Sequence, residues 1–289
     1  MKIRIEEKSG FCYGVVKAVG LADEILNRGE TLYSLGQIVH NEMEVKRLEK
    51  KGLRIIRHED LPSLHNCKVL IRAHGEPPET YEMARKNGIE LIDGTCPIVK
   101  KIQSGIHVRA DEKETLVVIF GKADHPEVKG LLGQSQGNSI VIQSAEDTGT
   151  LPNVPVIHLY SQTTMDSDAF LVIASLIEQK QKLSGGKLFI HNTICGHVSH
   201  RKPGLEKFAV ENDVIIFVGG AKSSNGKVLF QVCKVANSKS YFIGGPDELD
   251  DSWFSGAESV GITGATSTPR WQIEEVAGKI SEYIERTSN

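Results

Sequence analysis

The chain has 289 residues, of which 39% are hydrophobic and 25% charged, the composition of a globular protein able to bury sizeable cores. Its length corresponds to roughly two domains of about 150 residues each. Because 34 Lys and Arg face 37 Asp and Glu, the net charge is −3, which argues against a nucleic-acid-binding protein with its usual basic surplus. A local basic pocket for a small anion stays compatible with this balance.

The sequence gives no sign of a membrane segment. No stretch approaches the roughly 20 apolar residues that span a bilayer, and residues 1–6 lack the apolar core of a signal peptide. We therefore expect a cytoplasmic protein with no membrane partner. Five cysteines in such a chain favour metal binding or catalysis over a disulfide framework.

Short β-branched runs alternate with segments of helical apolar spacing along the whole chain. The continuously apolar runs 116–120 and 214–218 are typical of parallel strands covered by helices on both faces. This alternation predicts an α/β fold with small, mostly parallel sheets, and helices are expected over 170–181 and 272–286. The predicted strands are residues 2–5, 31–35, 69–72, 89–92, 116–120, 156–160, 188–190, 214–218 and 260–263.

A pattern of cysteine, glycine and polar residues occurs three times. Each of three cysteines follows a predicted strand through a short polar loop, and a second strand ends in a glycine 24 or 25 residues later. A polar residue stands four residues beyond that glycine, and a third strand ends in a polar loop. The cysteines are Cys12, Cys96 and Cys195; the glycines are Gly36, Gly121 and Gly219; the polar residues are His40, His125 and Ser223; the third loops are 73–75, 161–164 and 266–268.

This repeat predicts three pseudo-symmetric α/β lobes in place of two domains. The lobes comprise residues 13–95, residues 96–194, and residues 195–289 together with 1–12. Ligands of open α/β sheets bind at the carboxyl ends of the strands, so we expect one central site to which each lobe contributes a cysteine and polar loops. Cys67 and Cys233 have no counterparts in the repeat and are interpreted as buried small hydrophobic residues.

Three cysteines from three lobes are a candidate metal centre. Zinc held by three cysteines needs a fourth ligand, and the paired Cys-x-x-Cys pattern of structural zinc sites is absent. A [4Fe–4S] cluster usually takes four cysteines. With three, one iron is left to accept a substrate oxygen. The alternative is three unconnected buried cysteines.

The polar loops offer hydrogen-bond donors to an anion. Most of these residues are predicted at or just before helix N-termini, which bind phosphate through free N–H groups and the helix dipole. A single such residue more often caps a helix, but the same offset recurs in three lobes. The donors are His40, His74, His125, Ser223, Ser224, Asn225 and Ser267.

His125-Pro126-Glu127 is a candidate acid–base motif. Proline suits the first helical position, which directs His125 and Glu127 toward the same pocket. A carboxyl group in a dry cavity has a raised pKa and can donate a proton near neutral pH. Alternatively, Glu127 complements the helix dipole as a first-turn carboxylate. Loop 161–164 is either an N-cap cluster or a hydroxyl relay for a proton.

These motifs resemble the 4-hydroxy-3-methylbut-2-enyl diphosphate reductases of the non-mevalonate isoprenoid pathway. The resembling stretches run in family order over essentially the whole chain. They are Gly10-Phe11-Cys12-Tyr13-Gly14-Val15, Ile38-Val39-His40-Asn41, Arg72-Ala73-His74-Gly75, Asp93-Gly94-Thr95-Cys96-Pro97, residues 121–128, Ser161-Gln162-Thr163-Thr164, residues 192–195, Ser223-Ser224-Asn225 and Ser267-Thr268-Pro269.

The resemblance implies a monomeric enzyme with three lobes around a [4Fe–4S] cluster held by Cys12, Cys96 and Cys195. It implies that the substrate's C4 hydroxyl binds the fourth iron and leaves as water, giving isopentenyl and dimethylallyl diphosphate. Glu127 would supply protons, Thr163 would orient the hydroxyl, and a ferredoxin or flavodoxin would supply electrons. The residues implied to hold the diphosphate are His40, His74, His125, Ser223, Ser224, Asn225 and Ser267.

A few positions depart from the family pattern. Gly226 and Val228 stand where the family usually has a serine or threonine and an arginine, and Thr266 stands where alanine is usual. Residues 201–203 replace a frequent Arg-Gln pair. Two other functions stay open at this point. One is a hydrolase that binds zinc or another metal through the cysteines and a histidine, and the other is an iron–sulfur or phosphate-sensing binding protein.

Overall fold

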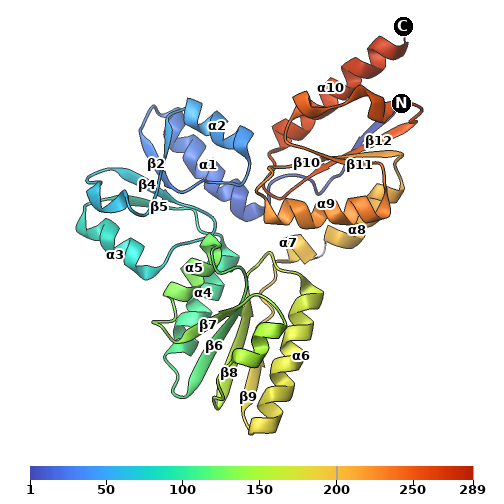
Figure 1. The fold of residues 1–289 in the computed structure, drawn as a ribbon. Helices are drawn as coiled ribbons and strands as arrows, with labels where there is room; N and C mark the ends of the chain where they lie inside the picture. Colours follow the sequence, from blue (N-terminus) through green and yellow to red (C-terminus); the bar gives the residue numbers. More distant parts are fainter. Residues whose placement is uncertain (200, 289) are drawn as a thin grey trace. The chain divides into compact units, whose positions relative to one another are not determined.

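The computed structural model of the protein, shown in Figure 1, describes residues 1–199 and 201–288. The chain forms two compact units, which we describe separately. Unit 1 comprises Met1–Glu30, Gln37–Leu53 and Gly196–Asn289, and unit 2 comprises Thr31–Gly36 and Arg54–Cys195.

The strands of the described residues form three sheets of four strands each, with one common strand order. In every sheet the second strand lies at one edge and is followed by the first, the third and the fourth. We name each sheet after its first strand. The β2 sheet consists of β3 (Leu53–Ile56), β2 (Leu32–Leu35), β4 (Lys68–Ile71) and β5 (Glu90–Asp93); the β6 sheet of β7 (Ser139–Ile142), β6 (Thr115–Phe120), β8 (Val156–Ser161) and β9 (Lys187–Ile190); the β10 sheet of β11 (Ser240–Ile243), β10 (Val214–Val218), β12 (Ser259–Gly264) and β1 (Lys2–Ile5).

The strand pairs bear out the predicted α/β class with small parallel sheets. β2, β4 and β5 run parallel, as do all four strands of the β6 sheet and of the β10 sheet. The first strand of the chain, β1, supplies the fourth strand of the last sheet, as the grouping of residues 1–12 with the third lobe requires. The boundaries of the three lobes themselves stay a prediction.

In the β6 and β10 sheets, the side chains of the central strands alternate between the two faces of the sheet, and both faces are apolar. In the β6 sheet, Val118 and Phe120 pack with Phe170 of α6 on one face, while Val117 and Ile119 pack with residues of α4 and α5 on the other. In the β10 sheet, Ile216 faces α10, and Phe217 faces α8 and α9. Helices on both faces explain why these strands are apolar along their whole length.

The helices begin and end where the sequence places caps and prolines. Proline occupies the first helical position of α3, α4 and α5, and α6 is capped by the Asp166 carboxylate and ends at Gly185, whose φ is 75°. The helices are α1 (Tyr13–Asn27), α2 (Glu42–Lys50), α3 (Pro78–Lys86), α4 (Pro97–Ala110), α5 (Pro126–Gly133), α6 (Ser167–Ser184), α7 (Gly196–Ser199), α8 (Arg201–Val210), α9 (Ser224–Ala236) and α10 (Arg270–Ser288), with 3₁₀ turns at Leu61–Ser63, Glu146–Thr150, Pro246–Glu248 and Asp251–Phe254.

The repeat of glycines has a structural counterpart in all three sheets. Each glycine follows the first strand and donates its N–H to the carbonyl at the end of the second strand, which closes the edge of the sheet. These bonds run from Gly36 to Ile56, from Gly121 to Ile142 and from Gly219 to Ile243, with N···O distances of 2.8, 2.9 and 2.9 Å.

Candidate functional site

The three repeated cysteines lie at equivalent places of the three sheets. Each follows the fourth strand and directly precedes a helix, and each is half-buried. Each also donates its backbone N–H to a carbonyl in the loop after the third strand of its own sheet. The bonds run from Cys12 to Thr266, from Cys96 to Ala73 and from Cys195 to Thr163, at 3.2, 3.0 and 2.9 Å. The cysteines are therefore fixed by the same main-chain contact in all three sheets.

Short polar turns bring two of these cysteines to their positions. The Asp93 carboxylate accepts a hydrogen bond from the Thr95 N–H (2.9 Å), and the side-chain Oδ1 of Asn192 accepts one from the Ile194 N–H (3.3 Å). Asx turns of this kind redirect the chain at the end of a strand. Burial alone would raise the pKa of Asp93, but the ion pair with Lys100 and the bonds from Thr95 hold it below its usual range.

The two spare cysteines behave largely as predicted. Cys233 is buried in the core of the β10 sheet, and burial raises the pKa of its thiol to about 12. Cys67 is half-buried against the core of the β2 sheet, so the prediction of a fully buried residue is wrong for it.

In unit 2, the Glu127 carboxylate accepts two hydrogen bonds from Thr163. One carboxylate oxygen of Glu127 accepts the Thr163 N–H and the other accepts the Thr163 hydroxyl, both at 2.7 Å. Glu127 is 2% exposed, and this burial raises its pKa to about 6 although the two bonds from Thr163 act to lower it. Glu127 is thus a buried carboxyl group with a raised pKa, as the His125-Pro126-Glu127 motif predicts, and its role as a proton donor stays a prediction.

His125 lies beside this pair as the N-cap of α5. Its Nδ1 accepts the Glu127 N–H at 3.2 Å, which leaves Nε2 to carry the proton of the neutral ring. The His74 ring meets the His125 ring edge-on, with 5.2 Å between centroids. Two predicted anion ligands are thus adjacent, and His125 can act as a donor through Nε2–H.

Loop 161–164 does not cap a helix, because α6 begins later and is capped by Asp166. Gln162, fully buried, instead holds the loop in place. Its side-chain oxygen accepts the Lys122 N–H (3.0 Å) and its amide donates to the Thr164 hydroxyl (2.8 Å). The sequence offered no signal for these hydrogen bonds of Gln162, which link the loops after β6 and β8.

A buried cation supports the loop that follows β2. The Arg72 guanidinium packs against Gly36, where a Cβ would come within 2.7 Å of Nη1, and it forms an ion pair with Glu76. Gly36 also has a φ of 78°, so both space and backbone conformation require glycine at this point of the repeat. Burial lowers the pKa of Arg72, and the adjacent Glu76 opposes that shift.

In unit 1, Ser223 and Ser267 meet at the start of α9. The Ser223 oxygen accepts the Gly226 N–H (3.0 Å) as the N-cap and accepts the Ser267 hydroxyl (3.2 Å). Both of its acceptor positions are then used, so the hydroxyl hydrogen of Ser223 can be donated to an anion. Ser224 is the first residue of α9, and its side chain lies outside what the structure describes.

Asn225 stands in the first turn of the same helix. Its Oδ1 accepts both the Thr266 N–H (3.2 Å) and the Thr266 hydroxyl (2.9 Å). Because an N–H must face an oxygen, this fixes the orientation of the carboxamide. Asn225 is 6% exposed, and its Nδ2 is buried without a hydrogen-bond partner among the described residues. Such a buried donor calls for a partner.

His40 is held in unit 1 through its neighbour Asn41. The Asn41 amide donates to the buried Gln272 side chain (2.7 Å), and the Gln272 amide donates to the Gly244 carbonyl (2.5 Å). Gly220 also lies against the carbonyl of His40, where a Cβ would be 2.2 Å from the oxygen. His40 is therefore fixed against the loop that leads to Ser223.

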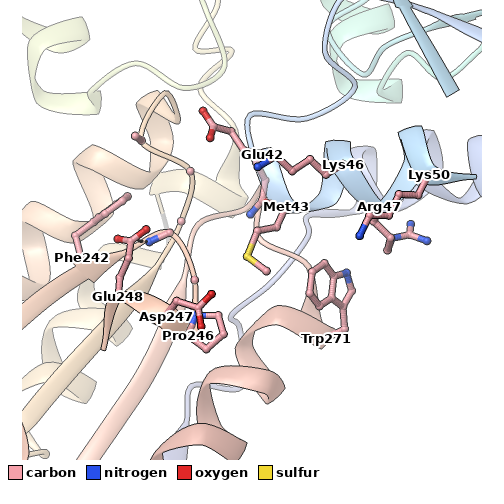
Figure 2. A pocket seen from close by; sticks show the side chains of 16 residues that line it. Glu42, Met43, Lys46, Arg47, Lys50, Phe242, Pro246, Asp247, Glu248 and Trp271 are labelled. Atoms are coloured by element: carbon pink, nitrogen blue, oxygen red, sulfur yellow. Dashed lines mark hydrogen bonds between the residues drawn. The ribbon is translucent and has the colours of Figure 1, made fainter. Parts of the chain in front are cut away.

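A cavity of about 660 Å³ lies in the same unit (Figure 2). Met43, Lys46 and Lys50 of α2 line one side, and Trp271 lines it from α10. Asp247 and Glu248 also line it, so it contains charges of both signs. None of the predicted site residues whose side chains are described lines it. The cavity is therefore separate from the predicted anion ligands.

Comparison with known proteins decides the family. A model of the family described as LytB protein matches residues 3–281. The chain belongs to this family. A relative from Bacteroides fragilis named 4-hydroxy-3-methylbut-2-enyl diphosphate reductase is 49% identical over 290 residues, which cover 99% of each chain. A relative of the same name from Chloroherpeton thalassium is 43% identical over 304 residues, covering 97% of this chain and 96% of its own.

Solved structures agree with this LytB assignment. A structure described as that of (E)-4-hydroxy-3-methyl-but-2-enyl diphosphate reductase, the terminal enzyme of the non-mevalonate pathway, has a TM-score of 0.76 and 37% identity, covering 98% of this chain and 100% of its own. The Plasmodium falciparum E-1-hydroxy-2-methyl-but-2-enyl-4-diphosphate reductase has a TM-score of 0.82 and 26% identity, covering 96% and 87%. The resemblance drawn from the sequence motifs is confirmed.

Two departures from the LytB pattern, Gly226 and Thr266, lie next to predicted anion ligands. At Gly226 a Cβ would be 3.1 Å from the Ser223 oxygen and 3.3 Å from the Ala265 Cβ, so a larger residue needs small shifts of both. Thr266 contacts Asn225 directly. Val228 is half-buried within α9, and nothing in the structure explains it. Among the helices of residues 1–199 and 201–288, none is both long and apolar enough to cross a membrane.

Proposed function

We propose that this protein catalyses the reductive dehydroxylation of 4-hydroxy-3-methylbut-2-enyl diphosphate to isopentenyl and dimethylallyl diphosphate. The relatives at 43–49% identity carry the name of the reductase, and the motifs that resemble this family run along the chain from residue 10 to residue 269. The observation that carries the proposal is the buried Glu127 carboxyl group, which accepts two hydrogen bonds from Thr163. The carbonyl of the same threonine accepts the N–H of Cys195.

Cys12, Cys96 and Cys195 would hold a [4Fe–4S] cluster. Their chemistry fits, because three half-buried thiols stand at equivalent helix starts, where the helix dipole favours the thiolate that ligates iron. The bound cluster would pass on, one at a time, the two electrons that a ferredoxin or flavodoxin supplies, and it would offer an iron without a protein thiolate. The rest of the chain would bind, orient and protonate.

The diphosphate would be held by the polar side chains of the repeated loops. In unit 1 these are the Ser223 hydroxyl and the Asn225 amide, together with the first N–H groups of α9. His40 and Ser267 belong to the set by their places in the motifs, and the Ser267 hydroxyl, which donates to Ser223, supports that residue. In unit 2 they are His74 and the Nε2–H of His125. Ser224 belongs to this set by its place in the motif. Neutral and histidine donors suit a chain with a net charge of −3.

Glu127 would deliver protons to the substrate. A carboxyl group with a pKa of about 6 is protonated in a useful fraction near neutral pH and loses the proton readily. Thr163 would orient the substrate hydroxyl, since its own hydroxyl is fixed by Glu127. Electrons would come from a ferredoxin or flavodoxin, and we propose a cytoplasmic monomer.

Anaerobic purification tests the proposal. The protein should be brown, with about four irons and four sulfides per chain, and substrate should change the spectrum of the cluster. Cys96→Ser should lose the cluster. Cys67→Ser is the matched control, because Cys67 is also half-buried but stands outside the repeat, and this variant should keep the cluster.

Each rival predicts a different result. A colourless protein with one zinc per chain would favour the metal hydrolase and end the reductase proposal. A brown protein that binds substrate but shows no turnover with a reduced ferredoxin or flavodoxin, or with a chemical reductant, would favour a binding protein.

A further inference from the structure

Asn225 and Glu127 occupy the same place in two sheets. Each lies two residues after the N-cap of the helix that follows the first strand, in α9 and α5 respectively. Each contacts a threonine in the loop after the third strand, and the carbonyl of that threonine accepts the N–H of a repeated cysteine. The two threonines are Thr266 and Thr163.

The hydrogen bonds of the two pairs correspond one to one. Thr163 donates its N–H and its hydroxyl to Glu127, both at 2.7 Å, and Thr266 donates its N–H and its hydroxyl to Asn225, at 3.2 and 2.9 Å. In the first pair the bonds reach two carboxylate oxygens. In the second, both bonds reach the single oxygen of a carboxamide.

This difference leaves the NH₂ group of Asn225 as the end of the pair that can donate hydrogen bonds. Two donors on Oδ1 fix the amide plane and draw electron density toward the oxygen, which strengthens the amide as a donor. Its Nδ2 is buried and has no partner among the residues whose side chains are described. Without the Thr266 hydroxyl, only the hydrogen bond from the Thr266 N–H would orient the Asn225 carboxamide.

We propose that Thr266 is a positioning residue for anion binding, acting through the Asn225 carboxamide. This rests on the proposed function, in which Asn225 binds the diphosphate. Thr266 itself does not contact the anion; its hydroxyl fixes the amide so that Nδ2–H points to a phosphate oxygen. The position where the family usually has alanine would then contribute to affinity in this chain.

A double-mutant cycle with inorganic pyrophosphate tests this role. Pyrophosphate binding to the anaerobically purified holoprotein is measured by calorimetry for the wild type, Thr266→Val, Asn225→Ala and the double variant. Thr266→Val removes the hydroxyl but keeps the branched shape, and it should weaken binding roughly three- to tenfold, as expected for one lost hydrogen bond. In the Asn225→Ala background it should have no further effect.

Thr266→Ser controls for shape and folding, because it keeps the hydroxyl and loses the methyl group. It should bind pyrophosphate as the wild type does. Unchanged binding by Thr266→Val, equal weakening in both backgrounds, or a serine variant as weak as the valine variant would each overturn the role of Thr266. If the wild type does not bind pyrophosphate, the anion site itself is wrong. The iron and sulfide content tests the proposed reductase separately.

Discussion

Glu127 and Asn225 share a backbone setting but have opposite hydrogen-bonding character. Each stands in the first turn of a helix and receives the N–H and hydroxyl of a threonine. A carboxylate only accepts, so the Thr163 bonds use both of its oxygens, and burial raises the pKa of Glu127 to about 6. A carboxamide keeps two hydrogens to donate. One repeated scaffold therefore carries the proposed proton donor in unit 2 and the proposed anion ligand in unit 1.

The comparison teaches where chemistry resides in a repeated fold. The strand order, the closing glycine and the main-chain bond to the cysteine are common to all three sheets of the described chain. In the β6 and β10 sheets the loop partner is a threonine in both cases, whereas the side chain two residues beyond the N-cap is Glu127 in one and Asn225 in the other. We therefore expect a few residues, placed on an otherwise constant backbone, to decide function. Exchanging or trimming those residues tests this directly.

The largest effect is expected for Glu127→Gln. The glutamine fills the same space and can still accept the Thr163 N–H, but it cannot deliver a proton. Turnover should fall by about 10²- to 10⁴-fold, the usual contribution of a general acid. Single-turnover rates of substrate consumption measure it, with iron content and pyrophosphate affinity unchanged from the wild type. A variant that turns over normally would show that Glu127 is not the proton donor.

Asn225→Asp should have the second-largest effect, because it places in unit 1 the kind of group that unit 2 carries. A carboxylate about 4 Å from a phosphate charge costs roughly 4 kcal/mol at an effective dielectric constant near 20, so the Kd for pyrophosphate should rise at least about a hundredfold. Calorimetry across pH checks this, since binding should recover as the new carboxylate is protonated.

Asn225→Ala is the control for charge. It removes the donor without adding a negative group, and it should weaken binding by roughly tenfold. If the alanine and aspartate variants lost the same affinity, the negative charge would not be the cause of the weaker binding of the aspartate variant.

The central strands and the local parts of the site could be predicted from the sequence. The apolar run 214–218 coincides with β10, and His125 caps a helix that begins at proline as expected. The predicted strand list lacks β3, β7 and β11, which are the second and outermost strand of each sheet. These four-residue strands lie at an edge of their sheets, only one or two residues of each are fully buried, and pairing with the first strand defines them.

Long-range side-chain contacts could not be predicted in the same way. Thr266 was visible only as a departure from a family pattern, and its partner Asn225 is 41 residues away. The bond between Asn41 and Gln272 joins residues 231 apart in the chain. Neither contact leaves a periodic or spacing signal, because each depends on how two loops meet after the sheet has formed.

Ionisation of Glu127 should also appear in the stability of the protein. Its pKa is raised from 4.5 to about 6 in the folded state, so the folded protein holds a proton that the unfolded chain has already lost between these values. The free energy of unfolding should therefore fall by about 2 kcal/mol as pH rises through this window and then level off.

Urea unfolding at a series of pH values measures this effect. Glu127→Gln should lack the decrease and be more stable than the wild type above pH 6, while the two should converge below about 4.5. If the free energies of unfolding of wild type and variant changed with pH in parallel, folding would not raise the pKa of Glu127. The contrast with the neutral Asn225 would then have no basis.

The smallest effect is expected for Thr163→Val, which removes one of the two bonds to Glu127 and keeps the N–H bond. Losing a donor to the charged form moves the pKa of Glu127 further upward, so the falling limb of the kcat/KM profile should shift to higher pH. The lost contact is worth about 1 kcal/mol, and the rate should fall by roughly tenfold or less. Thr163→Ser should restore the wild-type profile.

Thr164→Val is the matched control for this last change. Its hydroxyl accepts from the Gln162 amide in the same loop and has no hydrogen bond to Glu127 among the described contacts. The variant should therefore leave the pH profile in place even if it slows the reaction slightly. A shift of the profile by Thr164→Val as large as that by Thr163→Val would mean that loop geometry sets the acidity of Glu127. The one-to-one correspondence with the Asn225–Thr266 pair would then be a matter of backbone position alone.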